Sequence, residues 1–406
     1  MTTVAEKHAK EAQSTVTDGA FEPAFRELLA SVRVGAYDRE KNRTLLHAEV
    51  AQLRELGFTR LRLPRGRGGA GLGFEELFSR LIDLSAADSS LGHLYRGHIA
   101  FVEGVLIEGI DEPDAAVWVE RIARGDLVGN AQSERQETAA ITTRLDREDG
   151  VIRLTGTKYY TTGSIYADWI HLSALDGDER VAVTVRTAVA GVRSVDDWDG
   201  FGQLLTGSGT TTFEQVLVDP ADIRRSGDDP GHWQYIAAVF QLSLLAVVAG
   251  IAQRALEDTV DFVRPRRRIF GFPGETPPRD DELTQSIVGR LSSVAYGARA
   301  LVLGAARELE ALQGRLLDGS AAQGEQQAAM LDVFRVQQLV LPLVLDGLTE
   351  LFEVGGASAV SRTIGLDRHW RNARTIASHN PAIQRCRALG QFELNGTLPD
   401  WKAPSK

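Results

Sequence analysis

The position of one strand-rich stretch between two helical stretches most limits how this chain can fold. Residues 127–223 contain short β-branched runs, such as 181–185, that are separated by glycine and aspartate turns. Before this stretch apolar residues recur at helical spacing, and after Trp233 long helical patterns return. This order predicts a helical domain, then a small β-barrel or sandwich, and then an antiparallel bundle of helices.

The chain has 406 residues, which is too long for one simple hydrophobic core. The predicted division is a disordered tail at 1–20, an N-terminal helical domain at 21–125, a central β domain at 126–230, a four-helix bundle at 231–398 and a tail at 399–406. Helices of the bundle are expected at about 233–263, 282–317, 326–353 and 379–394, with a shorter piece at 361–375. The chain is therefore predicted to be mostly α with a central β domain.

Composition excludes several classes of protein. The net charge of −10 argues against general affinity for nucleic acid, which needs a cationic face. The single cysteine, Cys386, rules out an internal disulfide and fits a reducing cytoplasm.

No HExxH motif is present, and His93 and His98 do not have the spacing of a helical ligand pair, so no metal is expected. The chain starts without the apolar core of a secretory signal, and polar residues interrupt the apolar run 235–251, which favours a buried bundle helix over a membrane span.

Two polar motifs in the predicted β domain, 156–164 and 198–211, combine aromatic, hydroxyl and glycine residues. Glycine allows a ligand to approach the backbone, and serine and threonine are short donors and acceptors. Either a site for a flat ligand or ordinary β-turns would explain them. A formal GxGxxG at 66–71 lies between helical patterns and follows no strand, so we expect a rigid inter-helix loop and not a dinucleotide site.

Segments along nearly the whole chain, from about residue 25 to 398, resemble the acyl-CoA dehydrogenase fold in order and spacing. They are the glycine loop at 64–73, a flavin-flanking strand at 206–214, an Arg-x-x-Phe-Gly motif at 267–271, a glycine pair at 355–356 and a terminal helix segment at 371–385. In the dehydrogenases the arginine motif grips the cofactor pyrophosphate across a subunit interface. The resemblance, together with bundle helices that are apolar over more than one face, implies a homotetramer.

The residues expected to carry dehydrogenase chemistry are altered. Many acyl-CoA dehydrogenases use the glutamate of a Tyr-Glu-Gly-Thr segment to remove the α-proton. The matching stretch here is 378–381, and Asn380 stands opposite that glutamate, where an amide cannot accept the proton. A true acyl-CoA dehydrogenase with a displaced base at Glu257 or Asp258 remains an alternative.

These departures resemble two-component flavin monooxygenases of the same fold, in particular the DszC-type dibenzothiophene monooxygenases and the related sulfone-utilisation proteins. The matching segments are 128–131, 158–164, 197–202 and 370–379. The resemblance implies an enzyme that uses a C4a-hydroperoxyflavin to oxygenate a small organosulfur or aromatic substrate. Reduced FMN, or alternatively FAD, would come from a separate flavin reductase. Nitrogen oxidation or phenol hydroxylation on the same fold is the other alternative.

Carried over residue by residue, the resemblance implies three catalytic residues around the flavin C4a position: Asn130, Thr162 and His379. The Asn130 amide would hold the distal peroxide oxygen, and Thr162 would bond to flavin N5 or to the peroxide. His379, which ordinarily titrates near neutrality, would manage the proton. Each residue also has a purely structural alternative, namely a turn at Asn130, a strand position at Thr162 and a helix start at His379.

The resemblance also implies the lining of the flavin and substrate sites. Flavin contacts are expected from Asn130, Thr162, Ser164, Trp198, Ser208, Thr210, Arg267, Gly355, Gly356 and Arg371. Substrate contacts are expected from His93, Tyr95, Tyr160 and Phe201, whose rings would wall an aromatic ligand and keep water out. The expected partners are therefore a flavin reductase, O₂ and a small molecule, with no nucleic acid and no membrane.

Overall fold

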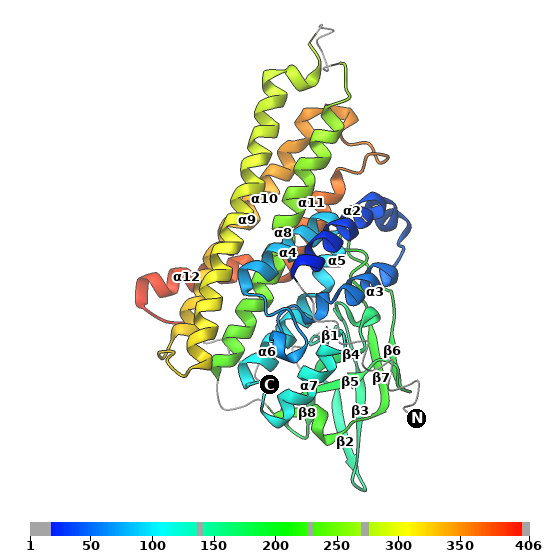
Figure 1. Ribbon diagram of the computed structural model, residues 1–406, viewed down its shortest axis with the longest axis vertical. Coiled ribbons are helices and arrows are strands. Elements are labelled where there is room, and N and C mark those ends of the chain that lie inside the picture. Colours follow the sequence, from blue (N-terminus) through cyan, green and yellow to red (C-terminus); the bar gives the residue numbers. More distant parts are fainter. Residues whose placement is uncertain (1–17, 136–140, 226–229, 269–275, 400–406) are drawn as a thin grey trace.

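The computed structural model describes residues 18–135, 141–225, 230–268 and 276–399. Figure 1 shows the long helices of the C-terminal region side by side, a β-sheet at the opposite end of the molecule, and the N-terminal helices between them. The predicted tails fall mostly on residues outside the described ranges. Within the described residues the first helix begins at Asp18, inside the tail predicted for 1–20.

The N-terminal domain is helical, as its apolar spacing predicts. Its helices are α2 (Asp18–Asn42), α3 (His47–Leu56), α4 (Phe74–Ala87), α5 (Ser89–Leu94), α6 (Arg96–Glu108) and α7 (Pro113–Ala123). Gly57 ends α3 in the left-handed conformation, and the Asp88 side chain accepts the backbone N–H groups of Ser90 and Leu91 to begin α5. The GxGxxG lies in a loop with one 3₁₀ turn at Arg65–Arg67. A methyl group at Gly69 would lie 2.0 Å from the Leu63 carbonyl oxygen, which accounts for that glycine.

The central domain is one mixed sheet whose strands follow the order β6-β7-β3-β2-β4-β5-β8, with β1 paired in parallel to β4. The strands are β1 (Val128–Ala131), β2 (Arg144–Glu148), β3 (Val151–Lys158), β4 (Trp169–Asp176), β5 (Glu179–Arg186), β6 (Val192–Ser194), β7 (Thr211–Leu217) and β8 (Ile223–Arg225). Alternate residues of β3 and β5 face the core of this domain, as period-2 alternation requires. Across the described strands the path is open, so the sheet is not a closed barrel.

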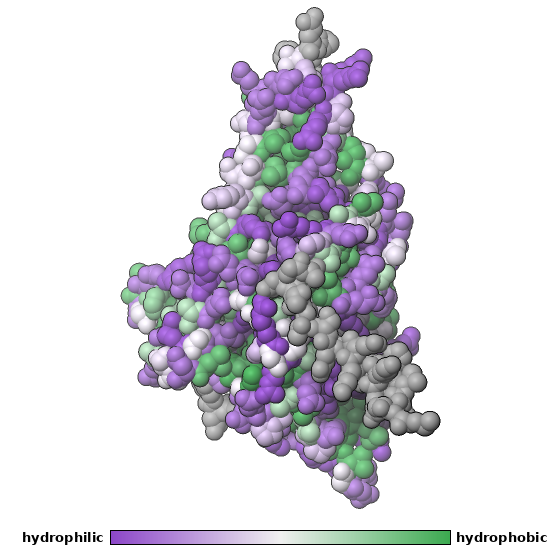
Figure 2. All heavy atoms as spheres, viewed as in Figure 1, coloured by the Kyte–Doolittle hydropathy of each residue, from purple (hydrophilic) through white to green (hydrophobic). Residues whose placement is uncertain are grey.

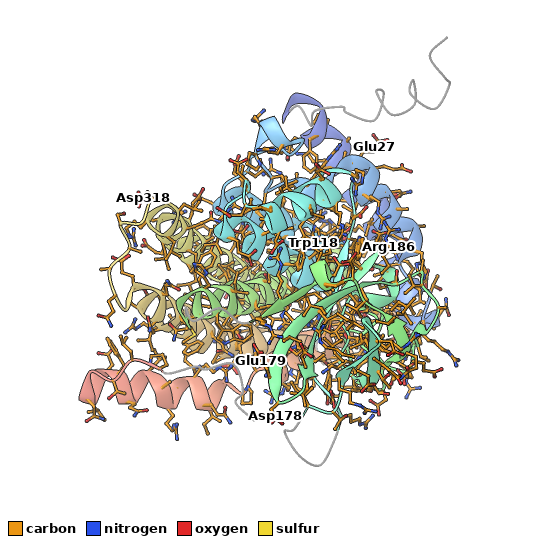
Figure 3. All side chains as sticks on the ribbon, turned by 90° about the horizontal axis from the view of Figure 1, so that it is seen from below. Glu27, Trp118, Asp178, Glu179, Arg186 and Asp318 are labelled. Atoms are coloured by element: carbon orange, nitrogen blue, oxygen red, sulfur yellow. The ribbon has the colours of Figure 1, made fainter. Side chains whose placement is uncertain are left out.

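Helices α6 and α7 cover one side of this sheet. Trp118 of α7, labelled in Figure 3, meets Trp169 of β4 edge-on, with ring centroids 5.2 Å apart. Leu63, Val102 and Val128 belong to the same hydrophobic cluster. The N-terminal domain and the sheet are therefore fixed to each other by a continuous apolar contact.

The C-terminal region contains α8 (Pro230–Val263), α9 (Glu282–Leu317), α10 (Glu325–Glu350), α11 (Asp367–His379) and α12 (Ala382–Asn395). The predicted last helix, 379–394, is wrong at its start, because His379 ends α11 and α12 begins at Ala382. Pro381 causes this break, since a proline disfavours the helical conformation in the residue before it, and Asn380 is extended (φ −120°, ψ 116°). Helix α12 points away from the rest of the molecule (Figure 1).

Two of the long helices, α8 and α10, are apolar enough over their length to cross a membrane by composition alone. In α8, however, 83% of the apolar window is buried inside the protein, which identifies it as the core helix of the bundle. In α10 the buried share is 44%, so this helix leaves apolar surface uncovered. Helices α4 and α6 both pack against α8, and the three helices support the candidate site.

Candidate active site

Two glycines in this region allow very close approaches of the backbone. A methyl group at Gly97 of α6 would lie 2.7 Å from Asn130 Cβ, and one at Gly129 of β1 would lie 2.7 Å from Ser164 Cα. The Asn130 backbone N–H donates to the Thr162 carbonyl at 3.2 Å. The sequence therefore brings Asn130, Thr162 and Ser164 together by keeping side chains out of the positions between them.

A chain of buried hydroxyl groups runs from Thr162 into the protein. Thr162 Oγ1 lies 2.8 Å from Ser208 Oγ, which lies 2.7 Å from Thr206 Oγ1. Thr206 Oγ1 donates to the Gln203 carbonyl at 2.9 Å. A carbonyl can only accept, so each hydroxyl in turn must donate toward Gln203. Thr162 Oγ1 then has only lone pairs left for a ligand.

Several buried polar atoms around this chain have no hydrogen-bond partner. They are Asn130 Oδ1, Ser164 Oγ and His93 Nε2. Buried polar groups are nearly always hydrogen-bonded in proteins, so a cluster of unsatisfied atoms needs an explanation. A polar ligand that occupies this place would satisfy them, and an isoalloxazine ring, with its nitrogen and carbonyl edge, is of that kind.

Two histidines from distant elements face each other on the helical side of the site. The rings of His93 on α5 and His379 at the end of α11 are 6.3 Å apart. His93 Nδ1 lies 3.0 Å from the Gln203 side-chain oxygen, and His379 Nδ1 lies 3.2 Å from the Asn380 side-chain oxygen. With each Nδ1–H donating to these oxygens, Nε2 of both rings is an acceptor. His379 Nε2 accepts from Arg96 Nη1 at 3.3 Å.

Both histidines are neutral at physiological pH. Burial, and then the positive charge of Arg96, lower the pKa of His93 to about 3. Burial, followed by the charge of Arg96, also holds the pKa of His379 well below its usual range. The expectation that His379 titrates near neutrality is therefore wrong for this structure. The alternative of a helix start is wrong as well, because His379 ends its helix.

Two of the predicted aromatic wall residues, Tyr160 and Phe201, lie near the surface. Tyr160, at φ +64°, meets Tyr159 and Trp198 with centroids 4.8 and 6.0 Å apart. Phe201 stacks on Trp370 at 6.3 Å. Tyr160 is 46% exposed and Phe201 is 55% exposed, so both have room to contact a ligand, but no ring contact joins them to His93.

Tyr95 lies in the core of the N-terminal domain. Its ring is fully buried and meets Phe58 at 4.9 Å and His98 at 6.4 Å. These contacts give the prediction of a substrate-facing Tyr95 no support. Tyr95 lies between α5 and α6, and its hydroxyl is buried without a hydrogen-bond partner.

Two polar residues predicted to bind the flavin have protein partners. Thr210 donates both its backbone N–H and its hydroxyl to the Asp197 carboxylate, each at 2.7 Å. Arg371 pairs with Glu40 at 3.1 Å and donates to the Phe201 carbonyl at 2.9 Å. Both residues therefore hold the 198–211 motif in place, which is an indirect contribution to the site.

The remaining predicted flavin contacts lie elsewhere. Trp198 donates its indole N–H to the Gly202 carbonyl at 3.0 Å and so shapes its own turn. Arg267 is exposed, and most of the motif that follows it lies outside the described residues. A methyl group at Gly355 would lie 2.5 Å from the Phe262 ring, and Gly356 has φ +49°. The glycine pair is therefore explained by packing and by the turn.

A cavity of about 460 Å³ lies beside the end of β3. Its lining includes Thr210, predicted as a flavin contact, together with Tyr159 and Asp197. One wall is made by the buried pair of Lys158 and Glu134, which are 2.8 Å apart. This pair ties the segment after β1 to β3 and so stabilises the strand on which Asn130 stands.

The displaced bases considered for dehydrogenase chemistry are held in ion pairs. Glu257 pairs with Arg33 at 2.7 Å. Asp258 lies 2.8 Å from His369 and is also bonded to Arg368. Burial alone would raise the pKa of Asp258, but the hydrogen bond from His369 and the neighbouring positive charges outweigh it and lower that pKa. The Asp258 carboxylate is therefore stabilised in its charged form, which does not suit a general base.

Sequence reasoning missed Gln203 and Arg96, which are central to the site. Gln203 binds His93, donates its backbone N–H to Asn372, and carries the carbonyl that ends the hydroxyl chain. It has φ +55°, which is uncommon for a residue other than glycine and has no signature in the sequence. Arg96 contacts a histidine that lies 283 positions away.

Comparison with known proteins finds relatives along most of the chain. The family described as acyl-CoA dehydrogenase, C-terminal domain, matches residues 242–383. The chain is 28% identical over 390 residues to a dibenzothiophene monooxygenase from Rhodococcus qingshengii, covering 92% of this chain and 93% of that protein. It is 27% identical to the probable FMNH2-dependent monooxygenase SfnC of Pseudomonas putida, covering 94% and 95%.

The solved structures agree with the sequence relatives. The complex of TdsC from Paenibacillus sp. A11-2 with FMN and indole superposes with a TM-score of 0.85 at 26% identity, covering 94% of this chain and 98% of that chain. The predicted acyl-CoA dehydrogenase-like fold is therefore confirmed.

Proposed function

We propose that the chain is a flavin-dependent monooxygenase of the acyl-CoA dehydrogenase fold, which uses reduced FMN and O₂ to oxygenate a small organosulfur or aromatic molecule. The observation that carries the proposal is the cluster of unsatisfied buried atoms at Asn130, Ser164 and His93. Reduced FMN would supply two electrons, so that one oxygen atom of O₂ enters the substrate and the other leaves as water.

The residues of the sheet side would bind and orient the flavin. Thr162 Oγ1 offers only lone pairs, because its proton is given to Ser208. Its partner must therefore be a donor, and N5 of reduced flavin carries a hydrogen whereas N5 of oxidised flavin does not. Asn130 Oδ1 and Ser164 Oγ would complete the polar edge. This pattern favours the reduced form of the cofactor.

The residues of the helical side would manage protons without adding charge. His93 and His379 are neutral. His93 Nε2 is a buried acceptor without a partner, whereas His379 Nε2 already accepts from Arg96. A buried neutral imidazole can take a hydrogen bond from a reacting hydroxyl but does not deliver a proton readily. Since unproductive proton delivery would release O₂ as hydrogen peroxide, the low pKa of both histidines suits oxygen transfer.

The protein is proposed to act as one component of a pair and as a homotetramer. Figure 2 shows apolar side chains at the surface over the long helices. Exposed apolar residues of the bundle include Leu283, Tyr296, Leu339, Ile383 and Leu394. Covering this surface with copies of the chain would remove it from water. A separate flavin reductase would release reduced FMN into solution. A single-chain mass in light scattering would contradict the tetramer.

The test is a single turnover under isotopically labelled O₂. Protein is mixed anaerobically with reduced FMN and dibenzothiophene, then exposed to labelled O₂, and the product is analysed by mass spectrometry. Incorporation of labelled oxygen, lost in Thr162→Val, supports the proposal. Oxidation of the flavin with stoichiometric hydrogen peroxide, across a panel of organosulfur and aromatic compounds, would reject it. Bleaching of oxidised flavin by an acyl-CoA would select the dehydrogenase alternative.

A further inference from the structure

One buried arginine of the site has no acidic partner. Arg96 is the first residue of α6 and is 8% exposed. Its Nε donates to the Phe240 carbonyl at 3.4 Å, its Nη1 donates to His379, and its guanidinium lies 4.7 Å from the centre of the Phe240 ring. Among the described residues no carboxylate lies within ion-pair distance of Arg96.

Arg62 shows what a structural buried arginine in this protein looks like. Its side chain is 9% exposed, and it pairs with Glu103 at 2.6 Å and with Gln313 at 2.7 Å. Burying a charge without such compensation is unfavourable, so it is rarely kept for stability. Arg96 is as buried as Arg62 but lacks the compensating anion.

The surroundings of Arg96 leave its charge uncancelled. The titratable groups that face this part of the site are His93 on α5, His379 on α11 and Arg385 on α12, and none of them is acidic. Burial lowers the pKa of Arg96 to about 10, so it is still protonated at neutral pH. The site therefore holds a net positive charge next to the acceptor atoms of two neutral histidines.

We propose that Arg96 binds the anionic group of the oxygen acceptor, so that the enzyme selects small substrates carrying a sulfinate or carboxylate. This inference rests on the proposed function and names its substrate class. A guanidinium presents paired N–H donors that match the two oxygens of such a group. Arg96 also adjoins Gly97, which contacts Asn130, so an anion held by Arg96 would lie at the edge of the proposed flavin site.

For a sulfinate the reaction balances without a further reactant. The sulfur forms one new S–O bond and is oxidised by two electrons, which gives a sulfonate. Reduced FMN gives up two electrons and two hydrogens, and the second oxygen atom of O₂ leaves as water. The negative charge stays on the substrate throughout, so the contact with Arg96 is kept from substrate to product.

The experiment measures binding without turnover. Full-length protein loaded with oxidised FMN is titrated by calorimetry with benzenesulfinate and benzoate, and with the neutral analogues methyl phenyl sulfone and benzamide. Wild type is compared with Arg96→Met and Arg96→Lys, and with Arg299→Met, whose guanidinium pairs with Asp83 on the surface, as the matched control. Arg96→Met is expected to lower the affinity for the anions by about 10- to 100-fold and the affinity for the neutral analogues by less than about twofold.

Thermal unfolding separates a binding role from a structural one. Arg96→Met removes an uncompensated charge, so its melting temperature should equal or exceed that of the wild type. Arg62→Met leaves Glu103 unpaired and should melt at a lower temperature. Anion affinity in the wild type should also be flat from about pH 6 to about pH 9, because arginine keeps its proton there. Affinity that rises as the pH falls would assign the anion to a protonated histidine and overturn the proposal.

Two further results would overturn it. One is a wild type that binds anions no better than their neutral analogues. The other is an Arg96→Met variant in which the binding of FMN is weakened while anion affinity is unchanged. The latter result would assign the positive charge to the flavin ring. Neither result depends on oxygen transfer, so the inference about Arg96 and the proposed monooxygenase activity can fail independently.

Discussion

The directed chain of hydroxyl groups predicts that the site distinguishes reduced from oxidised flavin, and Thr206→Val tests this. Thr206 ends the chain by donating to the Gln203 carbonyl at 2.9 Å. Valine has nearly the same shape but no hydroxyl, so the Ser208 proton is released to point toward Thr162. Thr162 can then donate to N5 of oxidised FMN as well as accept from reduced FMN.

The size of the effect follows from one hydrogen bond gained or lost. In the wild type, oxidised N5 would face the lone pairs of Thr162, which leaves a buried acceptor unsatisfied at a cost of about 1 to 3 kcal/mol. With about 2 kcal/mol, the preference for reduced FMN is roughly 30-fold. For a two-electron couple this raises the midpoint potential of bound FMN by about 40 mV. Thr206→Val should remove most of this preference.

The assay measures the affinities for oxidised FMN and, anaerobically, for reduced FMN. Thr211→Val is the matched control, because Thr211 Oγ1 is hydrogen-bonded to the hydroxyl groups of Thr161 and Ser194 and not to Thr162. Its affinity ratio should equal that of the wild type. If Thr206→Val keeps the wild-type ratio, or if the wild type binds both forms equally, the reasoning about the chain is refuted.

Two further predictions concern stability. Lys158→Met should destabilise the protein by about 3 to 5 kcal/mol in guanidinium unfolding, because it leaves the Glu134 carboxylate buried without its 2.8 Å partner. Adding Glu134→Gln should recover part of this loss. Full stability of the single variant would contradict the buried pair. Burial lowers the pKa of His93 to about 3 and those of His98 and His171 to about 4, from the usual 6.5. The unfolded chain therefore binds more protons than the folded protein, and the free energy of unfolding should fall as the pH drops below about 6.5. Each of these histidines should cost about 2 kcal/mol at about pH 5, and an unchanged free energy of unfolding between about pH 7 and about pH 5 would show that they are not buried and neutral.

The fold and the sheet side of the site could be predicted from the sequence. The order of helical, strand and helical patterns is a local property, and the glycine and hydroxyl motifs that carry Thr162 and Ser208 are short. Asn130 and Ser164 also lie in short motifs of this kind, and both have an unsatisfied buried atom at the site. The predicted class of flavin monooxygenase and its FMN cofactor agree with the named relatives.

The helical side could not be predicted, because its contacts join residues far apart in the chain. Gln203 and His93 are 110 positions apart, and Arg96 and His379 are 283 apart. The neutral state of His379 depends on burial beside Arg96, which a sequence pattern does not record. Thr210 and Arg371 were assigned to the flavin because their acidic partners, Asp197 and Glu40, could not be seen.

The most direct test of the central claim is to mix the anaerobic protein and reduced FMN rapidly with O₂ and follow the return of oxidised-flavin absorbance together with the consumption of O₂. A site that shields and orients the reduced flavin predicts that O₂ is consumed well before oxidised flavin appears. This delay should shorten in Thr162→Val and remain in Thr211→Val. If oxidised flavin appears as fast as O₂ is consumed, as it does for reduced FMN free in solution, the protein is not a reduced-flavin monooxygenase.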